Sequence, residues 1–145
     1  MLEARGALAA WGLDGPLRSP AVGGLINRTF LVGDPVHSVL QWVSPIFDPR
    51  IHDGIDAVTR RLEFAGLATP RLVPTPDGRL WFETHEFEAN AGGCWRILTF
   101  IPGVTVERVE GVGRAAAAGD LVGRFHAARA HWSQEFDAAR RATHH

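Results

Sequence analysis

The chain has 145 residues and a formal net charge of −1, and 46% of its residues are hydrophobic while 21% are charged. This composition excludes a disordered chain and suits a folded domain with a real core. The near-neutral charge argues against a nucleic-acid partner attracted by bulk charge. No apolar run reaches the roughly 18 residues that span a bilayer, and the N-terminal segment lacks a signal-peptide pattern. We therefore expect a cytoplasmic protein with no membrane and no nucleic-acid partner.

Two features of residue usage limit the chemistry. The single cysteine, Cys94, cannot form an internal disulfide, and it lies in an apolar run typical of a core strand, so we expect it to be buried. All 15 basic residues are arginine. A mechanism in which this chain supplies the ammonium group of a lysine is therefore excluded.

The first half of the chain predicts a helix followed by a β-hairpin. Residues 2–11 are rich in Ala and Leu, and glycine and proline at 12–16 end that helix. β-Branched and aromatic residues at 29–32 and 38–43 predict two strands. The turn signal at 33–35 joins them into a hairpin.

The second half predicts a helix, further strands and a long terminal helix. Apolar residues recur at helical spacing over about 50–65. Short strands are predicted at 70–73, 80–82 and 95–100. Pro102-Gly103 ends the last strand, and a helix follows from about residue 106. Its apolar face is formed by Leu121, Phe125, Ala128 and Trp132. Antiparallel hairpins around one helix indicate an α+β fold.

Several segments of the chain resemble a known family through their order and spacing, although no single segment is specific. They are Gly23-Gly24-Leu25-Ile26-Asn27-Arg28-Thr29-Phe30-Leu31-Val32, Val39-Leu40-Gln41, Phe47-Asp48-Pro49, the run from Trp95 to Gly103, and the run from Leu121 to His126. Together they resemble the start of the aminoglycoside phosphotransferase and choline kinase superfamily. The combination of G-G-x-I-N-x-T-[FY] with V-L-Q is most similar to the N-acetylhexosamine 1-kinase branch.

The resemblance implies a division of the chain into three parts. Residues 1–98 would form a protein-kinase-like N-terminal lobe, an antiparallel sheet with one packed helix at about 50–65. Residues 99–103 would form the hinge. Residues 104–145 would be the helical start of a C-terminal lobe that this chain leaves incomplete.

The same resemblance places a nucleotide under the glycine pair Gly23-Gly24. Glycines let backbone amides approach phosphate oxygens without a Cβ in the way, and Asn27 and Thr29 add hydrogen-bonding groups. A strand follows the glycines, which suits a kinase hairpin and not a P-loop, where a helix would begin. The simpler alternative is that the glycines only form a turn.

By the resemblance, Gln41 matches the position of the lysine that holds the nucleotide phosphates in protein kinases. Its amide brings no charge, so Mg²⁺ or an arginine such as Arg28 would neutralise the phosphates. The carboxylate of the following helix could be Asp53 or Asp56, and with no ammonium to pair we expect a solvated helix charge. The resemblance also implies that the hinge offers backbone groups to the adenine ring, from Thr99, Phe100 and Ile101. The alternative is that these residues form an ordinary edge strand.

The residues that perform phosphoryl transfer in kinases are missing from this sequence. Kinases need an aspartate at the acceptor hydroxyl, with an asparagine and an acid that hold magnesium. After the hinge the aspartates are Asp120 and Asp137, and neither lies in an H-x-D-x-x-x-x-N setting. The pair His52-Asp53 precedes the hinge and lacks the asparagine. We therefore assign no catalytic and no metal-binding residue.

These observations favour the N-terminal part of an ATP-dependent sugar or amino-alcohol kinase that is not catalytically competent as this chain. The full-length relative would use ATP and Mg²⁺ and phosphorylate a small hydroxylated acceptor. The first alternative is a non-catalytic nucleotide-binding or protein-interaction module, which could self-associate through the exposed face of the terminal helix. The second is a degraded kinase-like fold with no present activity.

Overall fold

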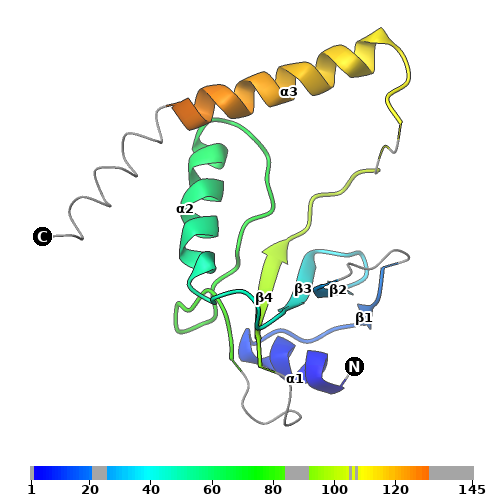
Figure 1. The fold of residues 1–145 in the computed structure, drawn as a ribbon. Coiled ribbons are helices and arrows are strands. Elements are labelled where there is room, and N and C mark those ends of the chain that lie inside the picture. The colour runs from blue at the N-terminus through cyan, green and yellow to red at the C-terminus, as the bar shows by residue number, and fades with distance from the viewer. Residues whose placement is uncertain (1, 21–25, 84–91, 105, 107, 131–145) are drawn as a thin grey trace, which may run out of the picture. The chain divides into compact units, whose positions relative to one another are not determined.

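The computed structural model describes residues 2–20, 26–83, 92–104, 106 and 108–130. Within these residues the fold is α+β, with three helices and a four-stranded antiparallel open sheet (Figure 1). The chain divides into two compact units, Met1–Thr59 with Pro70–Ile101 and Arg60–Thr69 with Pro102–His145. The sheet belongs to the first unit.

The strands follow one another across the sheet in chain order. They are β1 (Leu17–Arg18), β2 (Arg28–Val32), β3 (Ser38–Val43) and β4 (Cys94–Thr99). Every neighbouring pair is antiparallel. The predicted hairpin is therefore confirmed, and the strand predicted at 95–100 is confirmed with a shift of one residue. β1 was not predicted, because its two residues lie between Pro16 and Pro20 and carry no strand pattern.

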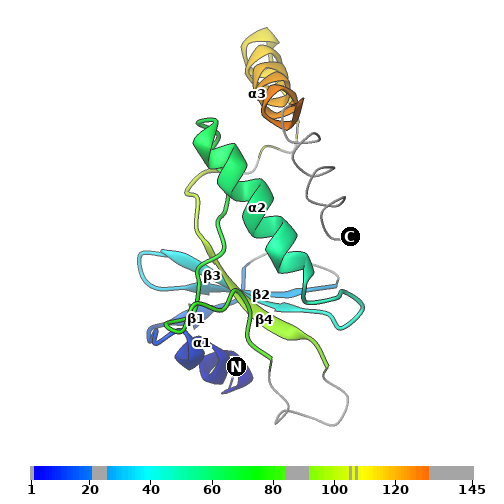
Figure 2. The same ribbon diagram turned by 90° about the vertical axis from the view of Figure 1, so that its left-hand side faces the viewer.

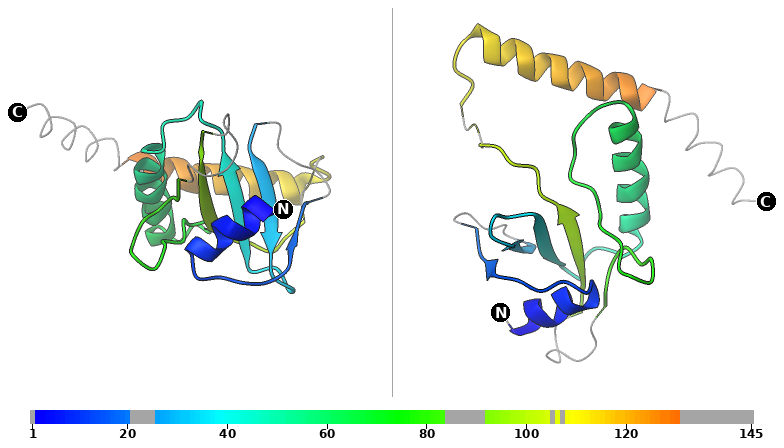
Figure 3. Two further views of the ribbon diagram at one scale, coloured as in Figure 1. Left: turned by 90° about the horizontal axis from the view of Figure 1, so that it is seen from below. Right: turned by 180° about the vertical axis from the view of Figure 1, so that it is seen from behind.

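Helix α1 (Leu2–Ala10) covers one face of the sheet and forms the main core with it. The buried residues of this segment recur at one-turn spacing and are Ala4, Ala7, Leu8 and Trp11. They share one core cluster with Phe30, Leu40 and Ile97 of the strands, and Figure 3 shows the helix lying across the strands. The helix ends at Gly12, which has a φ of 67° and donates its amide to the carbonyl of Ala9 at 2.9 Å. The predicted N-terminal helix is confirmed.

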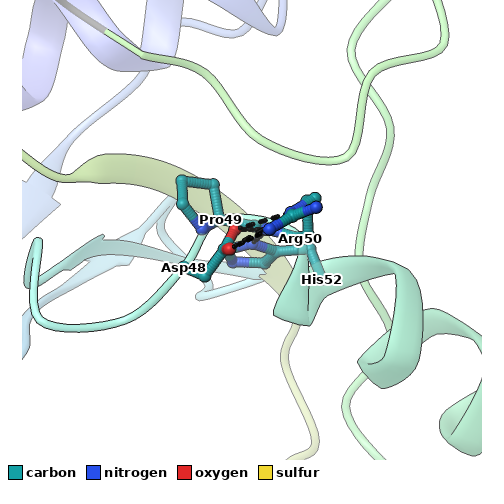
Figure 4. A network of polar contacts seen from close by, with 4 residues as sticks. All are labelled: Asp48, Pro49, Arg50 and His52. Carbon is teal, nitrogen blue, oxygen red and sulfur yellow. Dashed lines mark hydrogen bonds and ion pairs between the residues drawn. The ribbon is translucent and has the colours of Figure 1, made fainter.

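Helix α2 (Ile51–Phe64) begins with an aspartate cap (Figure 4). The Asp48 carboxylate accepts the backbone N–H of Arg50 at 2.9 Å, and Pro49 takes a first-turn position that needs no donor. The Arg50 guanidinium also donates to this carboxylate at 2.7 Å, and together these bonds lower the pKa of Asp48 to about 2. The helix predicted at about 50–65 is confirmed. In Figures 1 and 2, α1 and the first turns of α2 lie on opposite sides of the sheet.

Two predicted strands are wrong as regular strands. Segments 70–73 and 80–82 each contribute one isolated bridge, Leu72 opposite Leu98 and Phe82 opposite Trp95. Prolines at 70, 74 and 76 lack the N–H group that a longer ladder requires. The two segments therefore border the free edge of β4 without extending the sheet.

The second unit contains the end of α2 and helix α3 (Val112–Ala130). This helix starts later than the predicted residue 106, directly after Gly111, whose φ of 83° favours glycine. On its predicted apolar face Leu121 is 54% exposed and Phe125 is 41% exposed. Trp132 lies outside the described residues. No helix in the described part of the chain is both long enough and apolar enough to cross a bilayer.

Candidate functional site

The glycine pair predicted to cover a nucleotide, Gly23 and Gly24, lies outside the described residues. The strands on either side of it in the sequence, β1 and β2, are antiparallel neighbours, with Leu17 opposite Val32 and Arg18 opposite Leu31. The rest of the candidate site is therefore built from the sheet itself and from the end of β4.

The sheet has a second face, opposite to α1, on which the predicted residues Thr29 and Gln41 lie. Successive side chains of a strand point to opposite faces, so the neighbours of the core residues Phe30, Leu40 and Ile97 share this second face. At its centre this face carries six half-buried side chains, Thr29, Leu31, Val39, Gln41, Arg96 and Leu98.

Three of these side chains form a polar row across β2, β3 and β4. The register places Thr29 opposite Gln41 and Gln41 opposite Arg96. Gln41 Nε2 donates to Thr29 Oγ1 at 3.1 Å, and Arg96 Nε donates to Gln41 Oε1 at 3.0 Å. The Gln41 side chain is thus held from both sides, with its amide oxygen toward the arginine.

The other three side chains form an apolar row beside the polar one. Leu31 lies opposite Val39, and Val39 lies opposite Leu98. Along each strand the two rows are two residues apart, or about 7 Å. Since Leu98 directly precedes Thr99, the apolar row lies nearer to the predicted hinge, and the polar row lies farther along β4.

The backbone of the predicted hinge is already partly paired. The Thr99 amide donates to the carbonyl of Arg71 at 2.8 Å, and the Phe100 amide donates to the carbonyl of His37 at 3.4 Å. For the Ile101 amide, no hydrogen bond is found within the described residues. Of the three predicted adenine-binding amides, that of Ile101 is therefore the best placed to bind a ligand.

Asn27 and Arg28, both from the glycine-pair motif, make contacts within the described part of the chain. Asn27 Oδ1 accepts the backbone N–H of Ser44 at 3.2 Å, so its carbonyl oxygen ties β2 to the chain that leaves β3. Arg28 lies 3.5 Å from Glu3 of α1 and stacks over the ring of Trp42, at 5.1 Å from its centroid. The guanidinium of Arg28 is therefore on the α1 face of the sheet, opposite to the face that carries Gln41.

The two aspartates of α2 also differ from the expectation of solvated helix charges. Asp56 Oδ1 lies 3.5 Å from Arg71 Nη2, and the side chains are only 18% and 21% exposed. This half-buried ion pair connects α2 to the segment beside β4, so the expectation was wrong for Asp56. Asp53 is exposed and lines an open cavity of about 550 Å³ together with Arg79 and Trp81.

His52 is fully buried beside the candidate site and stacks on Trp81 with ring centroids 5.6 Å apart. Its Nδ1 lies 2.7 Å from the Pro49 carbonyl oxygen, which only accepts, so Nδ1 carries the proton (Figure 4). Nε2 is then an acceptor, and no partner for it is found among the described residues. Burial lowers the pKa of His52, and the charge of Arg96 lowers it further, which favours the neutral ring.

Cys94 is 1% exposed, as expected, and burial raises the pKa of its thiol to about 11. It is therefore neither a thiolate nucleophile nor a ready metal ligand. Among the described residues no three His, Cys, Asp or Glu side chains come together to hold a metal ion.

Arg96 is the site residue that the sequence did not identify. The sequence placed it in a strand, but only the register of β3 and β4 brings it beside Gln41. Among the described residues no carboxylate pairs with it, and burial lowers the pKa of its guanidinium. Arg96 is therefore a half-buried cation on the edge strand β4, and a bound anion would compensate its charge.

No protein-family model matches this chain, and none of the curated proteins compared with it does either. The resemblance to the phosphotransferases rests on the residues of the chain itself.

Proposed function

We propose that this chain is the nucleotide-binding part of an ATP-dependent small-molecule kinase of the aminoglycoside phosphotransferase and choline kinase type, closest to the N-acetylhexosamine 1-kinase branch. The observation that carries the proposal is the division of one sheet face into an apolar row and a polar row that contains a cation. The kinase-like N-terminal lobe, hinge and partial C-terminal lobe belong to the same proposal.

The two rows match the two halves of a nucleotide. A base is flat and largely apolar on its faces, so it suits Leu31, Val39 and Leu98, which lie nearest the chain that leaves β4. The phosphates are anionic and suit Thr29, Gln41 and Arg96. In the sequence, Gly23 and Gly24 precede β2, whose Thr29 belongs to the polar row, and they are proposed to cover the phosphates.

Phosphoryl transfer itself is not expected from this chain. The sequence after the proposed hinge does not supply the aspartate and asparagine of a kinase catalytic loop. In the full-length relative, ATP would be used with Mg²⁺, and the acceptor would be a small hydroxylated molecule. The chain is therefore proposed to bind ATP without turning it over.

Binding by the purified chain tests this function, with ATP and adenosine as the probes in isothermal titration. We expect both ligands to bind, and we expect no ATP-dependent phosphorylation of hexosamines or amino alcohols.

The variant Val39→Trp should abolish binding of both ATP and adenosine, because the indole fills the apolar row. Val122→Trp, on the exposed surface of α3, is the matched control and should bind normally. Absence of ATP binding by the wild-type chain would refute the proposal, and measurable turnover would refute its non-catalytic part.

A second candidate is an interaction module, which the exposed apolar side chains of α3 favour. Under this alternative the chain would associate through α3 and would bind no nucleotide. The same titration separates the two candidates, since only the first predicts that Val39→Trp removes a binding signal.

A further inference from the structure

The candidate nucleotide site has a cation although the chain has no lysine. We propose that Arg96 binds a phosphate group of the nucleotide and that Gln41 acts as its positioning residue rather than as a phosphate ligand. This inference rests on the nucleotide-binding function proposed above. It assigns the positive charge that binds phosphate to Arg96 on β4, and not to the position of Gln41 on β3.

The hydrogen bonds around Gln41 point to this division of roles. Its amide oxygen accepts from Arg96 Nε at 3.0 Å, and its amide nitrogen donates to Thr29 Oγ1 at 3.1 Å. A guanidinium has five N–H donors, and the one on Nε donates to Gln41. Within the described part of the chain, no hydrogen bond or ion pair is found for the two terminal nitrogens of Arg96. The donors that remain form the planar fork that binds phosphate oxygens in pairs.

Within the described residues, no carboxylate forms an ion pair with Arg96. The Arg96 side chain is half-buried. Its titratable neighbours do not offset the charge: the Cys94 thiol stays protonated because burial raises its pKa to about 11, and burial of His52 favours the neutral ring. Burying a cation without a partner costs free energy, and an arriving phosphate would remove that cost.

The rival cation of the same hairpin is placed where it cannot serve this row. Arg28 lies on the α1 face, near Glu3 and over Trp42. Its side chain belongs to the register position next to Thr29, which turns it to the opposite side of the sheet. Arg28 is therefore a matched comparison, since it is an arginine of the same sheet that the phosphate should not contact.

The test compares the affinity for ATP with that for adenosine, which has the same base and no phosphate. In Arg96→Met we expect ATP to bind about ten- to a hundredfold more weakly, with adenosine unchanged. Arg96→Lys should restore part of the difference, since it returns the charge without the fork. Gln41→Leu, which keeps the charge and removes the positioning bond, should weaken ATP by about three- to tenfold. Arg28→Met should change neither ligand.

The outcomes separate this inference from the function on which it rests. If the wild-type chain binds neither ATP nor adenosine, the proposed function fails and the inference fails with it. If the wild type binds both and Arg96→Met keeps its full ATP affinity, the role of Arg96 is refuted while nucleotide binding stands. Circular dichroism and thermal unfolding without ligand report whether each variant is folded. If Arg96→Met is not folded, Arg96→Lys and Gln41→Leu decide the question, and unchanged ATP affinity in both would overturn the proposal.

Discussion

The imidazole of His52 lies in an environment that favours its neutral form. It is fully buried, it stacks on Trp81, and the charge of Arg96 on β4 opposes protonation, while the Pro49 carbonyl and Asp53 on its own helix act in the opposite direction. Burial is the largest of these effects, so the pKa in the folded chain is below the ordinary 6.5. The unfolded chain therefore binds this proton more tightly than the folded chain does.

This difference predicts an acid-sensitive contribution to stability. The contribution of His52 is complete above about pH 6.5 and is lost progressively as the pH falls below that value toward the folded-state pKa. His52→Asn keeps a donor for the Pro49 carbonyl and cannot titrate, so its free energy of unfolding should decrease less between about pH 7.5 and about pH 5.5. Urea unfolding at the two pH values measures this. Trp81→Leu, which retains the imidazole, is the control and should keep a histidine-dependent decrease; equal pH dependence in wild type and His52→Asn would contradict the prediction.

At the level of single residues, the sequence could predict only those residues of the candidate site that lie within one local sequence motif. Thr29 and Gln41 were identified because they lie in local patterns, and the structure places them in hydrogen-bond contact. Arg96 was missed because its role depends on a register between strands more than fifty residues apart, which has no local signature. Arg28 was suggested from the same motif, and the structure places its guanidinium on the α1 face, away from Gln41.

At the scale of the secondary-structure elements, the chain enters β4 through Gly93, a position that has no room for a side chain. Gly93 has a φ of 108°, and a Cβ there would lie 2.5 Å from the carbonyl oxygen of Val43 on the neighbouring strand. Gly78 has a φ of 86°, and a Cβ there would meet nothing within 4 Å. The two positions thus share a backbone conformation that disfavours L-residues and differ in steric space.

We therefore expect unequal losses of stability from the same substitution. Gly78→Ala should cost about 1 kcal/mol, from the backbone conformation alone. Gly93→Ala should cost about 2–4 kcal/mol, because the β3 and β4 backbones must also move apart. Urea unfolding of both variants at neutral pH measures the difference. Similar losses of unfolding free energy in the two variants would contradict this prediction. They would mean that the backbone of β3 moves at little cost and that the pairing of β3 with β4 is less constrained than the geometry indicates.

The elements that the sequence predicted well are those with local signals. α2 has the Asp48 cap followed by proline, and the β2–β3 hairpin has a turn signal between two β-branched runs. β1 and the two isolated bridges are different, because each is defined by a partner strand and not by its own residues. Prolines near them obscured the difference between a strand and an extended edge segment.

For the whole molecule, the α+β class followed from the order of hairpin, helix and further strands, and the structure confirms it. The finer kinase-like assignment stays a prediction, because an α+β arrangement of this kind can serve many unrelated functions. What the sequence can indicate at this scale is a surface that carries apolar side chains.

The second unit carries that surface on α3. Leu121 and Phe125 lie one turn apart and are 54% and 41% exposed, and Phe64 at the end of α2 is 87% exposed. Large apolar side chains gathered on one unit favour association with a second copy of the chain, since burying each one stabilises a complex by about 1.5–3 kcal/mol. We therefore predict that the wild-type chain forms dimers or larger species as its concentration rises. Replacing both Leu121 and Phe125 by Ser should weaken this association by about tenfold or more.

Sedimentation velocity over a wide concentration range measures the association. Val112→Ser, at the first position of α3 and 86% exposed, is the control and should associate as the wild type does. A wild-type chain that remains monomeric at high concentration would show that solvent exposure of these side chains is tolerated and would remove α3 as a docking surface between copies.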